Sequence, residues 1–320
     1  MQLVARAGDD AMRASRRLSV DYQELAKLVA ADAAADDRFG YSVAIDGDTV
    51  VIGAYGDGSY RGAVYVLRTS DGGATYGQVA KLTASDAAAD DRFGYSVAID
   101  GSTVVVGAWA DDDGGSDSRE GSAYVFRTSN GGATYGQVAK LMASDAAAKD
   151  YFGYSVAIDG ATVVVGAWGD DDASVLPTTY FTSGSAYVFR TSDGGATYGQ
   201  VAKLTAADAA AAHYFGWSVA IDGNTVVVGA VNREAVYVFV TSDGGATYGQ
   251  VAKLTASDAA ENDMFGISVA IAGSTIVVGA YNDGNSGSNT GGSGSAYVFR
   301  TTDGGATYGQ VAKLTAADAA

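Results

Sequence analysis

One motif recurs five times along this chain, and this repetition constrains the fold more than any other feature of the sequence. Each copy begins with Phe-Gly, runs through a short apolar segment to a turn, and continues as an apolar run that ends in Gly-Ala. The copies begin near residues 39, 93, 152, 215 and 265. Repeats of this length are typical of solenoids and propellers, in which each copy forms one structural unit. Residues that all copies share are therefore expected to hold the scaffold, and function is expected where the copies differ.

The second copy shows how one repeat is expected to fold. Tyr95–Ile99 and Thr103–Ala108 are apolar runs separated by an Asp-Gly turn. Ala123–Thr128 and Tyr135–Met142 follow a longer variable segment, and the turn Asn130-Gly131-Gly132 separates them. Four short strands per repeat are typical of a propeller blade. The predicted fold class is therefore all-β, a β-propeller of about five four-stranded antiparallel blades.

Phe-Gly followed about a dozen residues later by Gly-Ala resembles the FG-GAP repeat of integrin-α-type β-propellers. The resemblance covers the chain from about Tyr22 onward, and it implies an adhesion module located outside the cell or at the cell surface. A second motif, Thr69–Tyr76, is similar to the Asp-box hairpin of sialidases and other families, where it is a structural turn. It recurs from Thr128, Thr191, Thr241 and Thr301, with Asn130 in place of the aspartate in one copy.

The sequence divides into an N-terminal extension, residues 1–20, and a repeat domain, residues 21–320. The extension mixes charges, lacks the apolar core of a signal peptide and is predicted to be poorly ordered. The outer-strand motif occurs six times, whereas Phe-Gly occurs five times. We therefore predict five blades that close into one ring, with either Tyr22–Ala30 or Gln310–Ala316 as the outer strand of the closing blade.

The chain is strongly acidic, with a formal net charge of −17. This charge argues against nucleic acid or an anionic membrane as the main partner, and it favours cations or a basic protein surface. The sequence contains no cysteine, which excludes disulfides and thiolate metal sites. No apolar run approaches the length of a membrane-spanning helix, so we expect no membrane insertion.

Antiparallel strand order places the variable loops and the acidic linkers on the same face of the predicted propeller. Aromatic residues follow Gly-Ala or Phe-Gly at the rim of this face, and we predict that they bind a partner: Tyr55, Trp109, Trp168, Trp217 and Tyr281. In integrin propellers an aromatic cup accepts a basic side chain, so the resemblance implies a protein partner with a basic surface, held by cation–π attraction. The alternative is that these rings pack between blades.

Two variable loops carry runs of aspartates, which suit a hard cation. The candidate calcium ligands are Asp111, Asp112, Asp113, Asp170, Asp171 and Asp172. The Asp-x-Asp-x-Asp-Gly calcium motif of integrin propellers is absent, because the chain has only Asp-Gly between the first two strands of a repeat. Calcium is thus the one cofactor that the sequence suggests, and the alternative is a solvated acidic loop.

The sequence predicts no enzyme. Its single histidine, His213, stands in a linker where other copies carry an aspartate, and no Ser-His-Asp set can be built around it. Three functional classes remain. The first is a non-catalytic binding or adhesion module for a protein partner, the second is a lectin-like module that binds a glycan, and the third is a carboxylate-dependent glycoside hydrolase.

Overall fold

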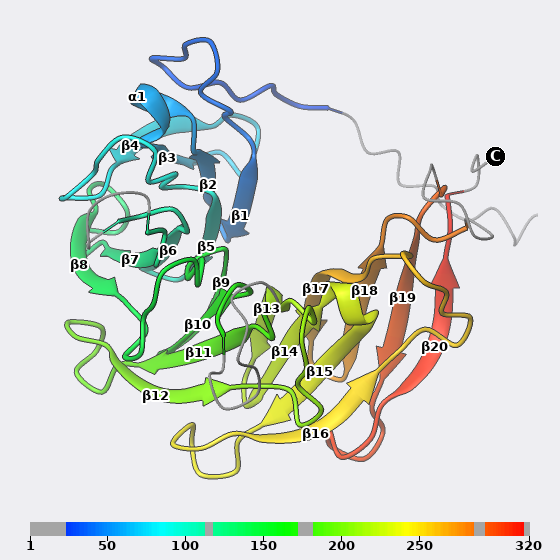
Figure 1. The fold of residues 1–320 in the computed structure, drawn as a ribbon. Helices are drawn as coiled ribbons and strands as arrows, with labels where there is room; N and C mark the ends of the chain where they lie inside the picture. The colour runs from blue at the N-terminus through cyan, green and yellow to red at the C-terminus, as the bar shows by residue number, and fades with distance from the viewer. Residues whose placement is uncertain (1–23, 113–117, 172–181, 285–291, 317–320) are drawn as a thin grey trace, which may run out of the picture.

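A computed structural model of the chain describes residues 24–112, 118–171, 182–284 and 292–316. These residues form five antiparallel sheets of four strands each, arranged in sequence order along an open arc (Figure 1). Each sheet is one repeat, and its strands lie side by side in the order in which they occur along the chain. The predicted all-β architecture of five four-stranded antiparallel blades is therefore confirmed.

The first sheet contains β1 (Ser42–Asp46), β2 (Thr49–Ala54), β3 (Ala63–Arg68) and β4 (Gly77–Leu82), with the short helical turn α1 (Asp57–Tyr60) between β2 and β3. The second contains β5 (Ser96–Asp100), β6 (Thr103–Ala108), β7 (Ser122–Arg127) and β8 (Gly136–Leu141). The third contains β9 (Ser155–Asp159), β10 (Thr162–Ala167), β11 (Ser185–Arg190) and β12 (Gly199–Leu204). The fourth contains β13 (Phe215–Asp222), β14 (Thr225–Ala230), β15 (Ala235–Val240) and β16 (Gly249–Leu254), with the 3-10 turn η1 (Val231–Arg233). The fifth contains β17 (Phe265–Ala272), β18 (Thr275–Ala280), β19 (Ser295–Arg300) and β20 (Gly309–Leu314).

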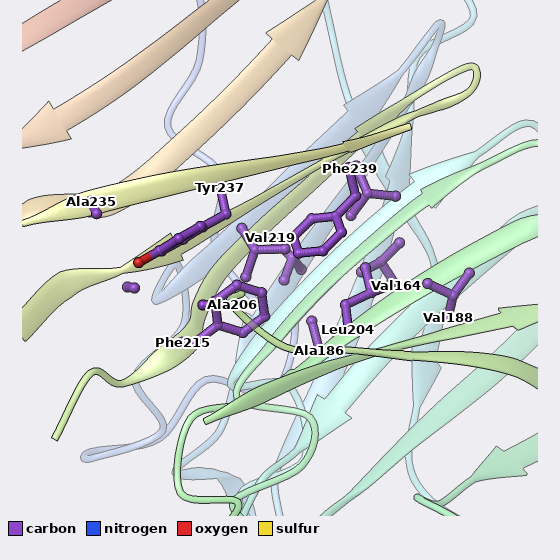
Figure 2. Close-up of a cluster of buried hydrophobic side chains, with 13 residues drawn as sticks. Val164, Ala186, Val188, Leu204, Ala206, Phe215, Val219, Ala235, Tyr237 and Phe239 are labelled. Carbon is purple, nitrogen blue, oxygen red and sulfur yellow. The ribbon is translucent and has the colours of Figure 1, made fainter. Parts of the chain in front are cut away.

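The hydrophobic cores lie between neighbouring sheets. Figure 2 shows the core between the third and fourth sheets, in which Val164 and Leu204 meet Phe215, Tyr237 and Phe239. In the three inner sheets the second strand is apolar on both sides because a neighbouring sheet covers each of its faces. No sheet can bury both apolar faces alone, so each repeat depends on its neighbours for stability.

Each sheet therefore has two different apolar faces. We call the face turned toward the next sheet the trailing face, and the face that meets the previous sheet the leading face. The trailing face of the first sheet presents Val51, Val64, Val66 and Leu82. The leading face of the second sheet presents Phe93, Val97, Ile99, Val104, Tyr124 and Phe126. The same arrangement recurs at the three later junctions.

Three side chains in each of the first three sheets also bond the next sheet, and the fourth sheet keeps two of these bonds because Val240 replaces the arginine. Ser42 Oγ donates a hydrogen bond to the carbonyl oxygen of Gly94 at 2.8 Å. Asp46 accepts the backbone N–H of the glycine in the next Asp-Gly turn at 2.7 Å. Arg68 donates to the carbonyl oxygen of Gly131 in the next Asp-box hairpin. These bonds fix the register of one sheet on the next.

The five sheets do not close into a ring, so the prediction of a closed five-bladed propeller is wrong. Among the described residues, every apolar cluster that spans two sheets joins consecutive ones, and none joins the fifth to the first. Val43 and Ile45 of β1 are 65% and 66% exposed. Figure 1 shows the separation between β1 and β20 at the two ends of the arc. Side-chain packing sets the rotation from one sheet to the next, and the four junctions leave the first and the fifth sheet apart.

The sixth copy of the outer-strand motif joins no sheet in the described part of the chain. Residues 24–28 have no strand partner, and Leu25 is 75% exposed. Leu28 and Ala30 instead pack against the leading face of the first sheet, next to Ile52 and Tyr65. Of the two terminal copies predicted as the outer strand of the last blade, the C-terminal one takes this place, because β20 completes the fifth sheet. Residues 1–20, predicted to be a poorly ordered extension, lie outside the described residues.

Glycine is required where neighbouring sheets come closest. A Cβ on Gly107 would lie 1.9 Å from the carbonyl oxygen of Gly153 in the next sheet. We expect Gly107→Ala to destabilise the protein by about 1–3 kcal/mol, because the sheets must separate to accept the methyl group. Denaturant unfolding measures this change. Gly136→Ala is the matched control, since a Cβ at Gly136 meets nothing within 4 Å. An equal loss in both variants would contradict the proposed close approach.

Candidate functional site

A continuous group of aromatic rings runs across four sheets at the end of the molecule that carries the variable loops. Its first row consists of the residues that follow the first four Phe-Gly pairs: Tyr41, Tyr95, Tyr154 and Trp217. Successive rings in this row have centroid distances of 4.8, 4.9 and 4.7 Å. The row forms because the first strands of neighbouring sheets lie side by side and present the same position of each repeat.

A second row comes from the residues that follow Gly-Ala. The ring centroids of Tyr55 and Tyr41 are 4.6 Å apart, and those of Trp109 and Tyr95 are 5.7 Å apart. Trp168 contacts Trp217 at 5.5 Å. We call the two rows together the aromatic belt, which consists of Tyr41, Tyr55, Tyr95, Trp109, Tyr154, Trp168 and Trp217. The structure thus brings four of the five predicted binding residues into one contiguous group, in which the rings also pack on one another.

One end of the belt already holds a cation. The guanidinium of Arg92 lies 5.0 Å from the ring centroid of Trp109, 5.1 Å from that of Tyr60 and 5.8 Å from that of Tyr55. These distances are within the range for cation–π attraction. The belt therefore has the geometry that an arginine side chain needs.

The other end of the belt opens into an apolar pocket of about 160 Å³. The pocket is lined by Tyr214, Trp217, Val231, Asn232, Met264, Ile267 and Tyr281. It exists because Val231 and Ile267 stand where the other repeats carry aromatic rings. Tyr281, the fifth predicted binding residue, lies here and is 60% exposed. We call this cavity the belt pocket.

A polar pocket of about 290 Å³ adjoins the belt pocket and shares Asn232 and Met264 with it. Glu234, Glu261 and Arg233 line the polar side, so that two carboxylates stand beside one guanidinium. Glu234 accepts the backbone N–H of Met264 at 3.0 Å, and burial raises the pKa of its carboxyl. The combined site therefore has an aromatic wall and an acidic rim.

Sequence reasoning did not identify Tyr214, Asn232 or Met264 as site residues. Tyr214 and Met264 immediately precede the Phe of Phe-Gly, a position that holds arginine in the first two repeats. This change from arginine to an apolar or aromatic residue is the sequence signal that could have marked both positions as part of a site. Asn232 lies in η1, a loop so short that the sequence offered no repeat to compare with it.

The predicted calcium ligands Asp111 and Asp170 are both held by lysines. Lys140 Nζ lies 2.8 Å from Asp111 and 2.7 Å from Asp86. Lys203 bridges Asp170 and Asp145 in the same way, at 2.7 Å each. A cation at either aspartate would therefore have to compete with an ammonium group that is already bound. The lysine belongs to the outer strand of the sheet, so this clamp connects a linker, a variable loop and a strand.

Two of the remaining calcium candidates, Asp112 and Asp171, lie in the described part of the chain. Asp112 accepts the backbone N–H of Arg119 at 2.5 Å. Burial raises the pKa of Asp171. Asp113 and Asp172 lie outside the described residues. Within the ranges that the structure describes, no three His, Asp or Glu side chains are grouped so that they could hold a metal ion.

A carboxylate in four of the five linkers accepts a backbone N–H three residues earlier. Asp91 accepts from Ala88 at 2.5 Å, and Asp150 accepts from Ala147 at 2.7 Å. His213 replaces the aspartate in one linker, and its Nδ1 accepts the equivalent N–H at 3.3 Å. The structure therefore confirms that the single histidine is a tolerated variant of a structural aspartate.

These linker carboxylates are almost fully buried, and this changes their titration. Burial raises the pKa of Asp150 to about 7, and the nearby carboxylate of Asp170 acts in the same direction. Burial likewise raises the pKa of Asp91 to about 6. Hydrogen bonds have the opposite effect in the Asp-box hairpins, where the hydroxyl of Thr75 helps to lower the pKa of Asp71 to about 2. The Asp-box hairpins join the third and fourth strands, at the opposite ends of the sheets from the belt.

The sequence profile of the FG-GAP repeat matches residues 22–67, 76–126, 135–189, 198–249 and 248–299. The chain belongs to the FG-GAP repeat family. No curated protein shows a significant match to this FG-GAP chain in sequence.

Solved structures share the fold of this FG-GAP protein at low sequence identity. Sqt1 of Saccharomyces cerevisiae matches with a TM-score of 0.51 and 11% identity, over 88% of this chain and 62% of Sqt1. A putative 6-phosphogluconolactonase from Bacteroides uniformis matches with a TM-score of 0.57 and 13% identity, over 87% of this chain and 72% of that one. A protein from Lactobacillus plantarum matches with a TM-score of 0.54 and 14% identity, over 86% and 71%. The chain thus spans less than two thirds of the length of Sqt1, and these likenesses show the fold alone.

In the parts of the chain that the structure describes, no helix is both long enough and apolar enough to span a membrane.

The buried carboxyl of Asp150 is expected to make stability depend on pH. The pKa of this carboxyl is higher in the folded chain than in the unfolded chain. Its contribution to the free energy of unfolding is therefore complete below about pH 4 and is lost as pH rises through about 7. We expect Asp150→Asn, which keeps a neutral acceptor, to remove a slope of up to about 1.4 kcal/mol per pH unit over this range. Urea unfolding at a series of pH values measures this slope.

Asp71→Asn is the matched control for that experiment. The pKa of Asp71 is lowered in the folded chain, so its contribution to the free energy of unfolding is lost only as pH falls below about 4. The second Asp-box hairpin already carries Asn130 at this position, so the change is compatible with the turn. A pH slope between 5 and 7 that is the same in Asp150→Asn and in the unmodified protein would refute the role of Asp150.

Proposed function

We propose that this FG-GAP protein is a non-catalytic binding or adhesion module whose belt pocket receives a basic side chain of a protein partner. The belt pocket carries the proposal, because it joins an aromatic wall to an acidic rim at the loop face of the arc. Arg92 supports it, since the protein itself already places a guanidinium against the same kind of rings.

Charge also favours a basic partner. The chain carries a net charge of −17, and on the polar side of the site the two carboxylates of Glu234 and Glu261 outnumber the one guanidinium of Arg233. A negative field raises the local concentration of cationic partners and increases their association rate. Cation–π contact then contributes about 0.5–2 kcal/mol once the cation is desolvated. An extracellular or cell-surface location fits this proposal and rests on the family resemblance alone.

Positions of the carboxylates support a role without catalysis. Asp91 and Asp150 have pKa values in a range useful for acid–base chemistry, but both are buried and bond the backbone of their own linkers. Asp111 and Asp170 are bound to lysines. In these four cases the carboxylates are engaged in holding the loops in place.

A short arginine-rich peptide is a suitable probe for this function. We expect Trp217→Ala and Tyr281→Ala each to weaken binding roughly 3- to 30-fold, because each removes one aromatic wall of the belt pocket. Titration calorimetry measures the affinity. Tyr41→Ala is the matched control, since Tyr41 is an exposed tyrosine at the far end of the belt. Equal losses in Tyr41→Ala and Tyr281→Ala would contradict a specific pocket.

Binding should weaken as salt is raised, because long-range attraction between exposed charges is screened at high ionic strength. A glycan ligand is the second candidate, and the pairing of Trp217 with the amide of Asn232 in one pocket favours it. Binding of a neutral oligosaccharide at the belt pocket with no salt dependence would replace the basic partner with a sugar. Turnover of chromogenic glycosides would contradict the non-catalytic role.

A further inference from the structure

The trailing face of the fifth sheet is built for a neighbour that is not present. It presents Val277, Ala296, Val298 and Leu314, the counterparts of the residues that pack inside the four junctions. Leu314 is 51% exposed, whereas the equivalent leucines Leu82, Leu141, Leu204 and Leu254 are between 2% and 4% exposed. A face of this kind is buried at every other place where it occurs in the chain.

The leading face of the first sheet lacks its neighbour as well. Val43 and Ile45 are mostly exposed, whereas their counterparts Val97 and Ile99 pack against the trailing face of the first sheet. The two ends of the arc therefore present complementary halves of one junction. The chain forms this same junction four times between consecutive sheets.

Polar groups of the junction are partly retained at the free ends. Ser268 is the counterpart of Ser42, which bonds the next sheet through its hydroxyl. Arg300 is the counterpart of Arg68, which bonds the next Asp-box hairpin. The aspartate of the Asp-Gly turn is replaced by Ala272, so one of the three bonds is lost. Two of the three hydrogen-bonding side chains therefore remain available for a further sheet.

The segment before the first sheet already behaves as the edge of a preceding sheet. Leu28 and Ala30 contact the first sheet as Leu82 and Ala84 contact the second. Asp32 accepts from Lys81 Nζ at 2.6 Å, as Asp86 accepts from Lys140. The first sheet therefore lacks only the strands of a preceding sheet, which would supply a trailing face. The fifth sheet has an exposed trailing face of this kind.

We propose that the protein self-associates head to tail, with the trailing face of the fifth sheet of one copy packed on the leading face of the first sheet of a second copy. A second copy is the occupant because it carries the required leading face and because the contact continues an interface established within the chain. Residues 24–30 and 310–316 carry the same motif, so one of them gives way to the other in the new junction. The interface joins two different surfaces, so a dimer still has one free leading face and one free trailing face, to which further copies can add.

The test uses the full chain with one end blocked at a time. Val298→Asp places a charge on the trailing face, and Ile45→Asp places one on the leading face. We expect the unmodified protein to form dimers and larger species as its concentration rises, and we expect each variant alone to be monomeric, by sedimentation velocity. A mixture of the two variants should form a 1:1 pair and nothing larger, because each supplies the face that the other has lost.

Controls keep the test decisive. Val79→Asp adds the same charge at an exposed valine of β4, whose counterparts Val138, Val201 and Val251 are exposed too, and it should associate like the unmodified protein. Leu314→Asp, at the exposed edge of the trailing face, replaces Val298→Asp if that variant fails to fold. A monomeric unmodified protein at all concentrations overturns the proposal. Failure of the mixture to pair, or dimers of Ile45→Asp alone, would also overturn it, because these results indicate a different interface.

Discussion

The packing of one sheet's leading face on the previous sheet's trailing face is the interaction on which the rest of this structure depends. In the second to fifth sheets the Phe of Phe-Gly and the tyrosine at the centre of the third strand lie in these contacts and are almost fully buried. Glycines such as Gly107 allow the backbones to approach, and serine and arginine side chains hold the register. Because each contact turns the next sheet by a similar amount, this packing also produces the arc and brings the loops of different repeats together at one rim.

Departures from the repeat at that rim create the candidate site. Aromatic residues at two positions of the repeat form the belt across the first four sheets. Between the fourth and fifth sheets, Val231 and Ile267 are smaller than the rings found elsewhere, and the belt pocket occupies the space that those rings would fill. The residues that the repeats share thus determine the scaffold. The substitutions in the fourth and fifth repeats determine the chemistry of the pocket.

The acidic composition serves structure as well as recognition. Lysines on the outer strands hold aspartates from the linkers and, in four sheets, from the variable loops. Buried linker carboxylates such as Asp150 bond the backbone of their own turns. Many of the carboxylates that make the chain look like a cation-binding surface are therefore already occupied, which leaves the aromatic belt as the distinctive feature of the loop face.

The sequence by itself determined the repeat, the four strands of each sheet, the turns and the aromatic rim, because strand periodicity and turn chemistry are local properties that a few residues specify. It also identified His213 as a variant of a structural aspartate. Only the tertiary structure decided that the arc stays open, that residues 24–28 join no sheet, that Asp111 and Asp170 are bound to lysines, and that Tyr214 and Met264 line a pocket with Tyr281. These outcomes depend on the rotation between sheets and on contacts between residues far apart in the chain, which no local pattern records.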